Sequence, residues 1–148
     1  MDNYLAYAED VIDYGVMGLL ILMSIVTLWL FIERMMFYST VRANDYDHRD
    51  NLEIDLTDNI GIISAIGSNA PYVGLLGTVI GIMLAFYTMG DVGTVDAKKI
   101  MVGLALALKA TAMGLIVAMP AIVVYTLLLR KVEKILTVFD IAQDKKVK

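Results

Sequence analysis

The sequence predicts an all-α membrane protein with three transmembrane helices, because apolar residues dominate the composition and form three long runs. Of 148 residues, 59% are hydrophobic and 19% are charged, and the mean hydropathy is +0.71. In water, so apolar a chain would expose large hydrophobic patches. Residues 14–32 and 60–90 carry no charge, and residues 100–129 carry only Lys109. Each run reaches the roughly 18–20 residues that cross the hydrocarbon core as a helix.

The first span is expected at about residues 12–33. Residues 1–13 contain four acidic side chains and no Lys or Arg, which is unlike the basic start of a cleaved signal peptide, so we expect a retained helix. Trp29 stands near the end of this span, as an interfacial aromatic anchor does. Glu33 and Arg34 close the span and are expected at the level of the lipid headgroups.

A connector over residues 34–58 follows, in which apolar and charged residues alternate, and we expect it to be a short helical or interfacial segment. The lone His48 lies there among acidic residues and is expected to be solvated. One His and no Cys do not make a metal site, and the chain has no nucleotide-binding loop. We therefore expect no metal, no cofactor and no nucleic-acid partner.

The second and third spans are expected at about residues 60–90 and 100–130, joined by an outer loop at 91–99. A continuous helix of 30 residues is about 45 Å long, so both should tilt or extend beyond the bilayer into the cytoplasm. The tail, residues 131–148, keeps apolar residues at three/four spacing between charges, which predicts that the third helix continues as an amphipathic extension. These apolar residues are Val132, Ile135, Leu136 and Phe139.

The distribution of basic residues predicts the orientation of the chain. Nine Lys and Arg residues fall on one side, eight in the connector and tail and one, Arg130, at the end of the third span, whereas the opposite side has only Lys98 and Lys99. The positive-inside rule therefore places the N-terminus in the periplasm and the C-terminus in the cytoplasm.

Small residues are concentrated on the second and third spans. On the third, residues 103, 107 and 111 form one small-xxx-small ladder, and 110, 114 and 118 form another. Such ladders let helix backbones approach closely in lipid. They could simply dock the two helices within one chain. Two ladders on one helix are expected to provide more close-packing surface than one intrachain partner needs, which favours homo-oligomerisation as well. The packing residues are Gly74, Gly77, Gly81, Gly103, Ala107, Gly114 and Ala118, with Ala70, Ala110 and Ala121 beside them.

Two threonines stand at matching depths on the arms of this hairpin. Thr78 lies 12 residues before Gly90, and Thr111 lies 12 residues after Lys99. Both hydroxyls should therefore lie about 18 Å from the outer loop, near the middle of the bilayer. Each Thr could bond only to its own helix. Alternatively, the two hydroxyls could line a common polar seam.

Lys109 is the only charge inside a span, and such residues are often functional. It lies about 200° around the helix from Thr111, so it cannot share the face of Thr111. The favoured interpretation is a lysine that reaches outward to the headgroups or to Asp13, with an interface or proton-handling role as alternatives. Pro71 and Pro120 each remove a backbone hydrogen bond and are expected to kink their helices.

Two motifs resemble those of a known family. Residues 69–83, NAPYVGLLGTVIGIM, resemble the helix-two signature of ExbB and TolQ, and more distantly of MotA, while residues 107–121, ALKATAMGLIVAMPA, resemble the helix-three signature. The Glu33–Arg34 pair also fits. Three spans resemble ExbB and TolQ rather than MotA, which has four, and the short connector resembles a compact form of ExbB.

The resemblance implies a pentamer-like ring in the bacterial inner membrane, enclosing single-span ExbD- or TolR-type helices that carry a membrane Asp. Protonation of that Asp would drive motion that energises TonB or TolA for work at the outer membrane. Thr78 and Thr111 correspond to threonines that line the lumen of the ring and face this Asp. The family often has a Glu at the position of Leu106, so no proton-carrying role is transferred to that position.

The resemblance thus predicts a subunit of a proton-motive-force-driven energy transducer, of ExbB type in a TonB–ExbB–ExbD system, and not an enzyme. The alternatives are a TolQ-type subunit of the Tol-Pal system, which differs in its partner, and a membrane scaffold that conducts no ions. A small lipid-modifying enzyme is disfavoured because the apolar runs 14–32, 60–90 and 100–129 contain no acidic residue or histidine.

Overall fold

The computed structural model describes residues 2–42, 45–91 and 97–147, and the elements in these ranges are four α-helices. They are α1 (Asp2–Thr40), α2 (Arg49–Thr57), α3 (Ile60–Asp91) and α4 (Ala97–Val147). Three of them contain segments that are long and apolar enough to cross a bilayer, at Asp13–Thr40, Ile60–Tyr87 and Ile100–Lys145. The predicted all-α class is confirmed for the described residues, and three helices qualify as membrane spans by length and composition.

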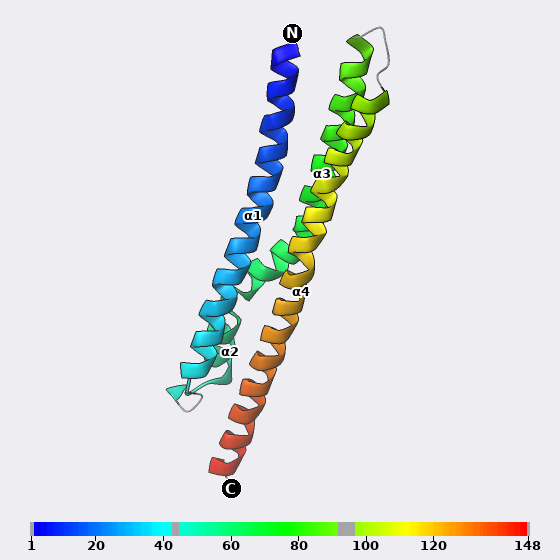
Figure 1. Cartoon of the computed structure of the whole chain (residues 1–148). Coiled ribbons are helices and arrows are strands. Elements are labelled where there is room, and N and C mark those ends of the chain that lie inside the picture. The colour runs from blue at the N-terminus through cyan, green and yellow to red at the C-terminus, as the bar shows by residue number, and fades with distance from the viewer. Residues whose placement is uncertain (1, 43–44, 92–96, 148) are drawn as a thin grey trace.

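The helices form an elongated bundle (Figure 1). The N-terminus of α1 lies at the same end as the tips of α3 and α4, whereas α2 and the C-terminus lie toward the opposite end. α3 and α4 run antiparallel and pack side by side, and α4 continues past the start of α3 alongside α1 and α2. Each long apolar segment is helical because backbone in contact with lipid must satisfy its hydrogen bonds within the segment.

The helices extend further than the sequence predicted. α1 begins at Asp2 and continues to Thr40, so the first seven residues of the expected connector are helical. The charged pair at residues 33 and 34 marked the predicted end of the apolar run, but charges do not end a helix. Neither Pro nor Gly occurs between them and Thr40. Part of the expected outer loop, residues 92–96, lies outside the described residues.

The amphipathic extension of the third helix is confirmed. α4 is continuous for 51 residues, and Val132, Leu136 and Phe139 are buried on its inner face. They join Leu52 and Leu56 of α2, both fully buried, in one hydrophobic cluster. The connector is therefore helical in part, and it packs against the end of the bundle.

A tight turn separates α2 from α3. The Asp58 N–H donates to the carbonyl oxygen of Ile54 at 3.0 Å, and Asn59 follows with a φ of 60°. Asn tolerates this left-handed conformation better than most residues with a side chain. The turn fixes where α3 begins, and hence the register of its small residues against α4.

Candidate functional site: a threonine pair between two glycine-rich helices

α3 and α4 approach so closely at Gly74 and Gly114 that no side chain would fit between their backbones. A Cβ built on Gly74 would lie 2.6 Å from the carbonyl oxygen of Ala110, and one on Gly114 would lie 2.7 Å from that of Ala70. Ordinary contacts begin at about 3.4 Å. Glycine is required at both positions because backbone, which cannot move aside, occupies the space.

The same contact continues toward the C-terminal end of α3. A Cβ on Gly77 would lie 2.8 Å from the Cβ of Ala110, and one on Gly81 would lie 2.9 Å from that of Ala107. Gly103 faces Ala85 at 3.2 Å. Small residues therefore hold the two helices together over several turns.

The inference that two ladders on α4 exceed the needs of one intrachain contact was wrong. Residues of both ladders face α3, as the contacts of Gly103, Ala107, Ala110 and Gly114 show, and Ala118 is also buried. At about 100° per residue, the six ladder positions fall within an arc of roughly 100°, which one neighbouring helix can cover. The ladders account for the docking of α3 on α4 and give no separate evidence for self-association.

Thr78 and Thr111 meet at this contact. Their hydroxyl oxygens lie 2.6 Å apart, and the Thr78 hydroxyl is also 2.8 Å from the carbonyl oxygen of Ala107. Contacts with the carbonyl oxygen of Gly74 are longer, at 3.3 Å from Thr78 and 3.4 Å from Thr111. The shortest bonds therefore run between the helices, so the structure favours the shared seam over two threonines that bond only to their own helices.

The seam lies beside exposed apolar surface. Thr78 is buried, whereas Thr111 is only partly buried. Leu75, one turn from Thr78, and Leu108, one turn from Thr111, are 51% and 61% exposed in the single chain. The hydroxyl pair thus stands at the edge of a face that lipid or another subunit must cover.

Lys109 lies on the other side of α4 and pairs with α1. Its ammonium is 3.7 Å from the Asp13 carboxylate, and both side chains are partly exposed. The interpretation of Lys109 as an outward-reaching lysine that finds Asp13 agrees with this geometry. It is well placed to fix α1 against α4 and does not contact the threonine seam.

The two prolines lie within continuous helices, Pro71 in α3 and Pro120 in α4. Pro71 follows the fully buried Ala70 and precedes the closest contact at Gly74, whereas Pro120 is exposed. Each leaves a carbonyl four residues earlier without its helical donor. The expected kinks remain a prediction.

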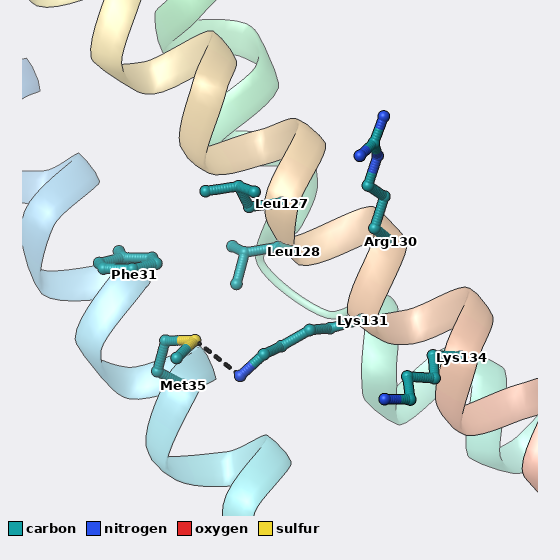
Figure 2. Close-up of a pocket in the computed structure, with 7 residues that line it drawn as sticks. All are labelled: Phe31, Met35, Leu127, Leu128, Arg130, Lys131 and Lys134. Carbon is teal, nitrogen blue, oxygen red and sulfur yellow. Dashed lines mark hydrogen bonds between the residues drawn. The ribbon is translucent and has the colours of Figure 1, made fainter.

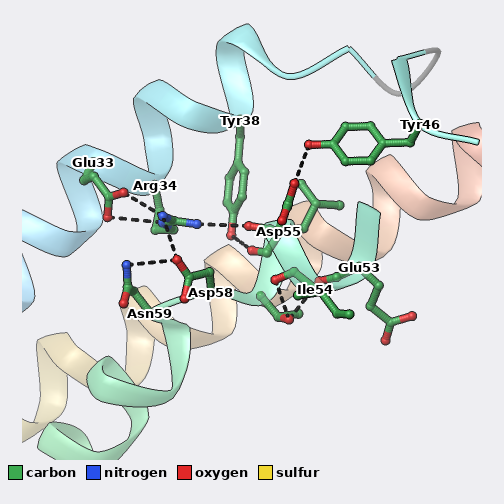
Figure 3. Close-up of polar contacts among 11 residues, drawn as sticks. Glu33, Arg34, Tyr38, Tyr46, Glu53, Ile54, Asp55, Asp58 and Asn59 are labelled. Carbon is green, nitrogen blue, oxygen red and sulfur yellow. Dashed lines mark hydrogen bonds and ion pairs between the residues drawn. The ribbon is translucent and has the colours of Figure 1, made fainter. Parts of the chain in front are cut away.

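A second polar cluster joins α1 to α2, and the sequence did not reveal it (Figure 3). The Arg34 guanidinium binds both carboxylate oxygens of Glu33, at 2.6 and 3.2 Å, and donates to the carbonyl oxygen of Asp55 at 3.1 Å. The buried Tyr38 hydroxyl donates to the carbonyl oxygen of Leu56 at 2.8 Å. These carbonyls belong to the last turn of α2, which lacks helical donors of its own.

Arg34 is only 5% exposed, so its side chain is buried within the chain, and its expected position at the level of the headgroups remains a prediction. Its charge lies at the negative end of the α2 dipole, where a cation is favourable. The Tyr46 hydroxyl donates to the Asp55 carboxylate at 2.8 Å, and this hydrogen bond raises the pKa of Tyr46. The cluster is a structural clamp and offers no chemistry for proton transfer along the seam.

The comparisons with known proteins agree with these features. Residues 30–141 match the MotA/TolQ/ExbB proton channel family. The chain is 55% identical over 127 residues to the biopolymer transport protein ExbB of Helicobacter pylori, which covers 86% of this chain and 88% of that protein. It is 53% identical over 129 residues to ExbB of Aquifex aeolicus, covering 86% and 87%.

A longer relative matches only in part. ExbB of Pseudomonas putida is 41% identical over 78 residues, which is 53% of this chain and 24% of that protein. The similar lengths of the Helicobacter and Aquifex relatives agree with the predicted compact form. With three apolar helices long enough to span a bilayer, the chain is a multi-pass inner-membrane protein, and it belongs to the MotA/TolQ/ExbB proton channel family.

Proposed function

We propose that this chain is the ExbB-type subunit of an energy transducer that couples proton flow across the inner membrane to transport at the outer membrane. It works as a homopentameric ring with a single-span, ExbD-like subunit that bears a membrane Asp, and with a TonB-like protein. The observation that carries the proposal is the contact between Thr78 and Thr111, 2.6 Å apart at the matched depth of two family motifs.

The hydroxyl pair suits a carboxyl group that is alternately protonated and ionised. A hydroxyl can donate to a carboxylate and accept from a carboxylic acid, because it carries both a donor and lone pairs. A lysine at this position would hold the carboxylate in a permanent ion pair. Lys109 is not directed toward the threonines but toward Asp13. In this proposal the partner's Asp carries the proton, and the threonines solvate it in both states.

The exposed surface beside the seam supports assembly around an axis. Leu75, Val79, Leu108 and Leu115 are all between 45% and 61% exposed in the single chain, and they flank the two threonines. In a ring, this face would contact neighbouring copies and the enclosed helix of the partner. The bias of basic residues supports an orientation with the N-terminus in the periplasm and the α4 extension in the cytoplasm.

The experiment that tests the proposal replaces each threonine by valine, which keeps the shape and removes the hydroxyl. A hydrogen bond to a charged group contributes about 1.5–3 kcal/mol, so loss of one hydroxyl should slow proton-dependent transport roughly 10- to 100-fold. Thr78→Val and Thr111→Val should still assemble with the ExbD-like subunit, because the glycine contacts remain.

Thr126→Val is the matched control. Thr126 lies on the same helix, is exposed, and bonds to its own helix at the carbonyl oxygen of Ile122, 2.9 Å away. It should leave transport unchanged. Normal transport in both seam variants would refute the assignment of the threonine seam. If the wild-type complex assembles but conducts no protons, the scaffold alternative is favoured.

A further inference from the structure

The part of α4 beyond its apolar run has an exposed face that the rest of the chain does not cover. α4 is 51 residues long, or about 77 Å, whereas the hydrocarbon core is only about 30 Å thick. Because the apolar run ends before Arg130, the residues after it are expected to lie in water. Val138 and Ile141 stand on one side of this stretch, and they are 56% and 53% exposed.

The charges on the exposed side of this stretch are sorted by sign. At about 100° per residue, its basic residues share one arc of the helix surface with the two exposed apolar residues, and its acidic residues share the neighbouring arc. The basic arc consists of Arg130, Lys131, Lys134, Val138, Ile141 and Lys145, and the acidic arc consists of Glu133, Thr137, Asp140 and Asp144, all exposed.

This sorting is unlike a helix face that is merely solvated. Such faces often mix the two signs, because opposite charges four residues apart on a helix attract each other. Between residues 130 and 145, no acidic residue stands four positions from a basic one. The helix therefore keeps its charges apart, so that each arc presents one sign to its surroundings.

Most of these charges have no opposite charge within the chain. Two are in contact with other helices: the Lys131 ammonium lies 3.2 Å from the sulfur of Met35 on α1, and the Asp140 carboxylate lies 3.4 Å from the Arg49 guanidinium (Figure 2 shows the first contact). The residues of the two arcs that form no ion pair within 4.0 Å in the described part of the chain are Arg130, Glu133, Lys134, Asp144 and Lys145.

The arcs complement each other, which indicates a second copy of this chain as the surface that covers them. If the basic arc of one copy faces the acidic arc of the next, each copy uses both arcs once, and the contact repeats around an axis. The centres of the arcs are roughly 100° apart around the helix. In a closed ring of roughly four to six copies, each helix has its two neighbours at directions about 90–120° apart, so the arcs fit a small ring.

The two arcs also continue the exposed face of α4 that lies in the apolar run. Leu115 and Ile116 precede Glu133 and Lys134 by about five full turns, so each pair lies on the same side of the helix. Leu115 and Ile116 are 45% and 56% exposed. One uninterrupted face of α4 thus extends from the level of the threonine seam to the end of the tail.

We propose that the part of α4 after Arg130 is a contact surface between neighbouring copies of this chain. Lys134 and Lys145 of one copy face Glu133 and Asp144 of the next, and the contact covers Val138 and Ile141. The inference rests on the homo-oligomeric ring of the proposed function and names a surface that holds the ring together outside the membrane. Because the contact is head-to-tail, it also fixes the order in which the two arcs follow each other around the ring.

The test measures the association of the purified full-length chain in detergent by sedimentation over a series of dilutions. An exposed ion pair changes an association constant by up to about fivefold, and a like-charge contact opposes association by a similar factor. Lys134→Glu/Lys145→Glu and Glu133→Lys/Asp144→Lys should therefore each weaken association on the order of 10- to 100-fold. High salt should weaken association of the wild type, because it screens exposed charges.

Two further variants separate charge complementarity from damage to the fold. Lys134→Arg/Lys145→Arg keeps the sign and should associate as the wild type does. The fourfold variant, which combines both reversals, restores opposite charges across the contact and should regain association close to that of the wild type. Circular dichroism of each variant should show unchanged helix content.

The proposal is overturned if either double reversal associates as tightly as the wild type, or if the fourfold variant associates no better than the double reversals. Both results leave the ring of the proposed function standing, because they concern only this surface. A wild-type chain that stays monomeric at every dilution would overturn the ring and this contact together.

Discussion

Replacing Gly74 by alanine should push α3 and α4 apart, because backbone of α4 occupies the space that the methyl group needs. The new Cβ would lie 2.6 Å from the carbonyl oxygen of Ala110 and 3.0 Å from the Cα of Thr111, whereas ordinary contacts begin at about 3.4 Å. Relieving the first contact needs a separation approaching 1 Å. The hydrogen bond from Thr78 to the Ala107 carbonyl, now 2.8 Å, would then be lost or severely weakened.

The expected cost follows from these two effects. Overpacking costs typically 1–3 kcal/mol, and a lost hydrogen bond costs about 0.5–1.5 kcal/mol. The better helix propensity of alanine offsets at most about 1 kcal/mol. We therefore expect Gly74→Ala to lower the free energy of unfolding by roughly 1–3 kcal/mol, measured by titration with SDS in mixed micelles and followed by circular dichroism.

Gly61→Ala is the control on the same helix. No atom lies within 4 Å of a Cβ at Gly61, so this change should be neutral or stabilise by up to about 1 kcal/mol. If the Gly74 and Gly61 variants have the same stability, the close approach of α3 to α4 at Gly74 is wrong.

Four further substitutions test the remaining polar contacts. Lys109→Met and Asp13→Asn should each change the free energy of unfolding by less than about 1 kcal/mol, since the pair is partly exposed. A double-mutant cycle should show weak coupling between them. Strong coupling or loss of transport would contradict the interpretation that this pair only helps to hold α1 against α4. Tyr38→Phe should cost about 1 kcal/mol, because it removes one buried hydrogen bond. Arg34→Met should lower the free energy of unfolding by about 1.5–3 kcal/mol and speed proteolysis of the connector. If stability and proteolysis are unchanged, the Arg34 cluster is not needed to hold α2 against α1.

The sequence predicted the parts of the fold that depend on one-dimensional patterns. Three apolar runs, each long enough to cross a bilayer as a helix, predicted the three spans. The three/four spacing of apolar residues predicted the α4 extension. The equal depth of Thr78 and Thr111 followed from equal distances to one hairpin loop, because two helices of the same rise keep the same depth. Whether the two hydroxyls meet was left open by the sequence, and the structure brings them to 2.6 Å.

The features that were missed depend on three-dimensional packing. The burial of Arg34 arises from α2, a short helix that folds back and presents its free carbonyls to α1. The helix α1 continues to Thr40, beyond the expected end of the membrane span, because charged residues do not end a helix. Both ladders on α4 were counted as separate faces because the narrow arc that they share was not considered.

Cysteine cross-linking to the ExbD-like subunit tests the central claim most directly, and the chain has no native cysteine to interfere. We predict that Thr111→Cys forms a disulfide with a cysteine placed at the membrane Asp of the co-expressed partner, whereas Lys109→Cys, at nearly the same depth on the opposite face of α4, does not. Cross-linking from Lys109→Cys alone, or from neither position, would contradict a threonine seam that faces the partner's carboxyl group.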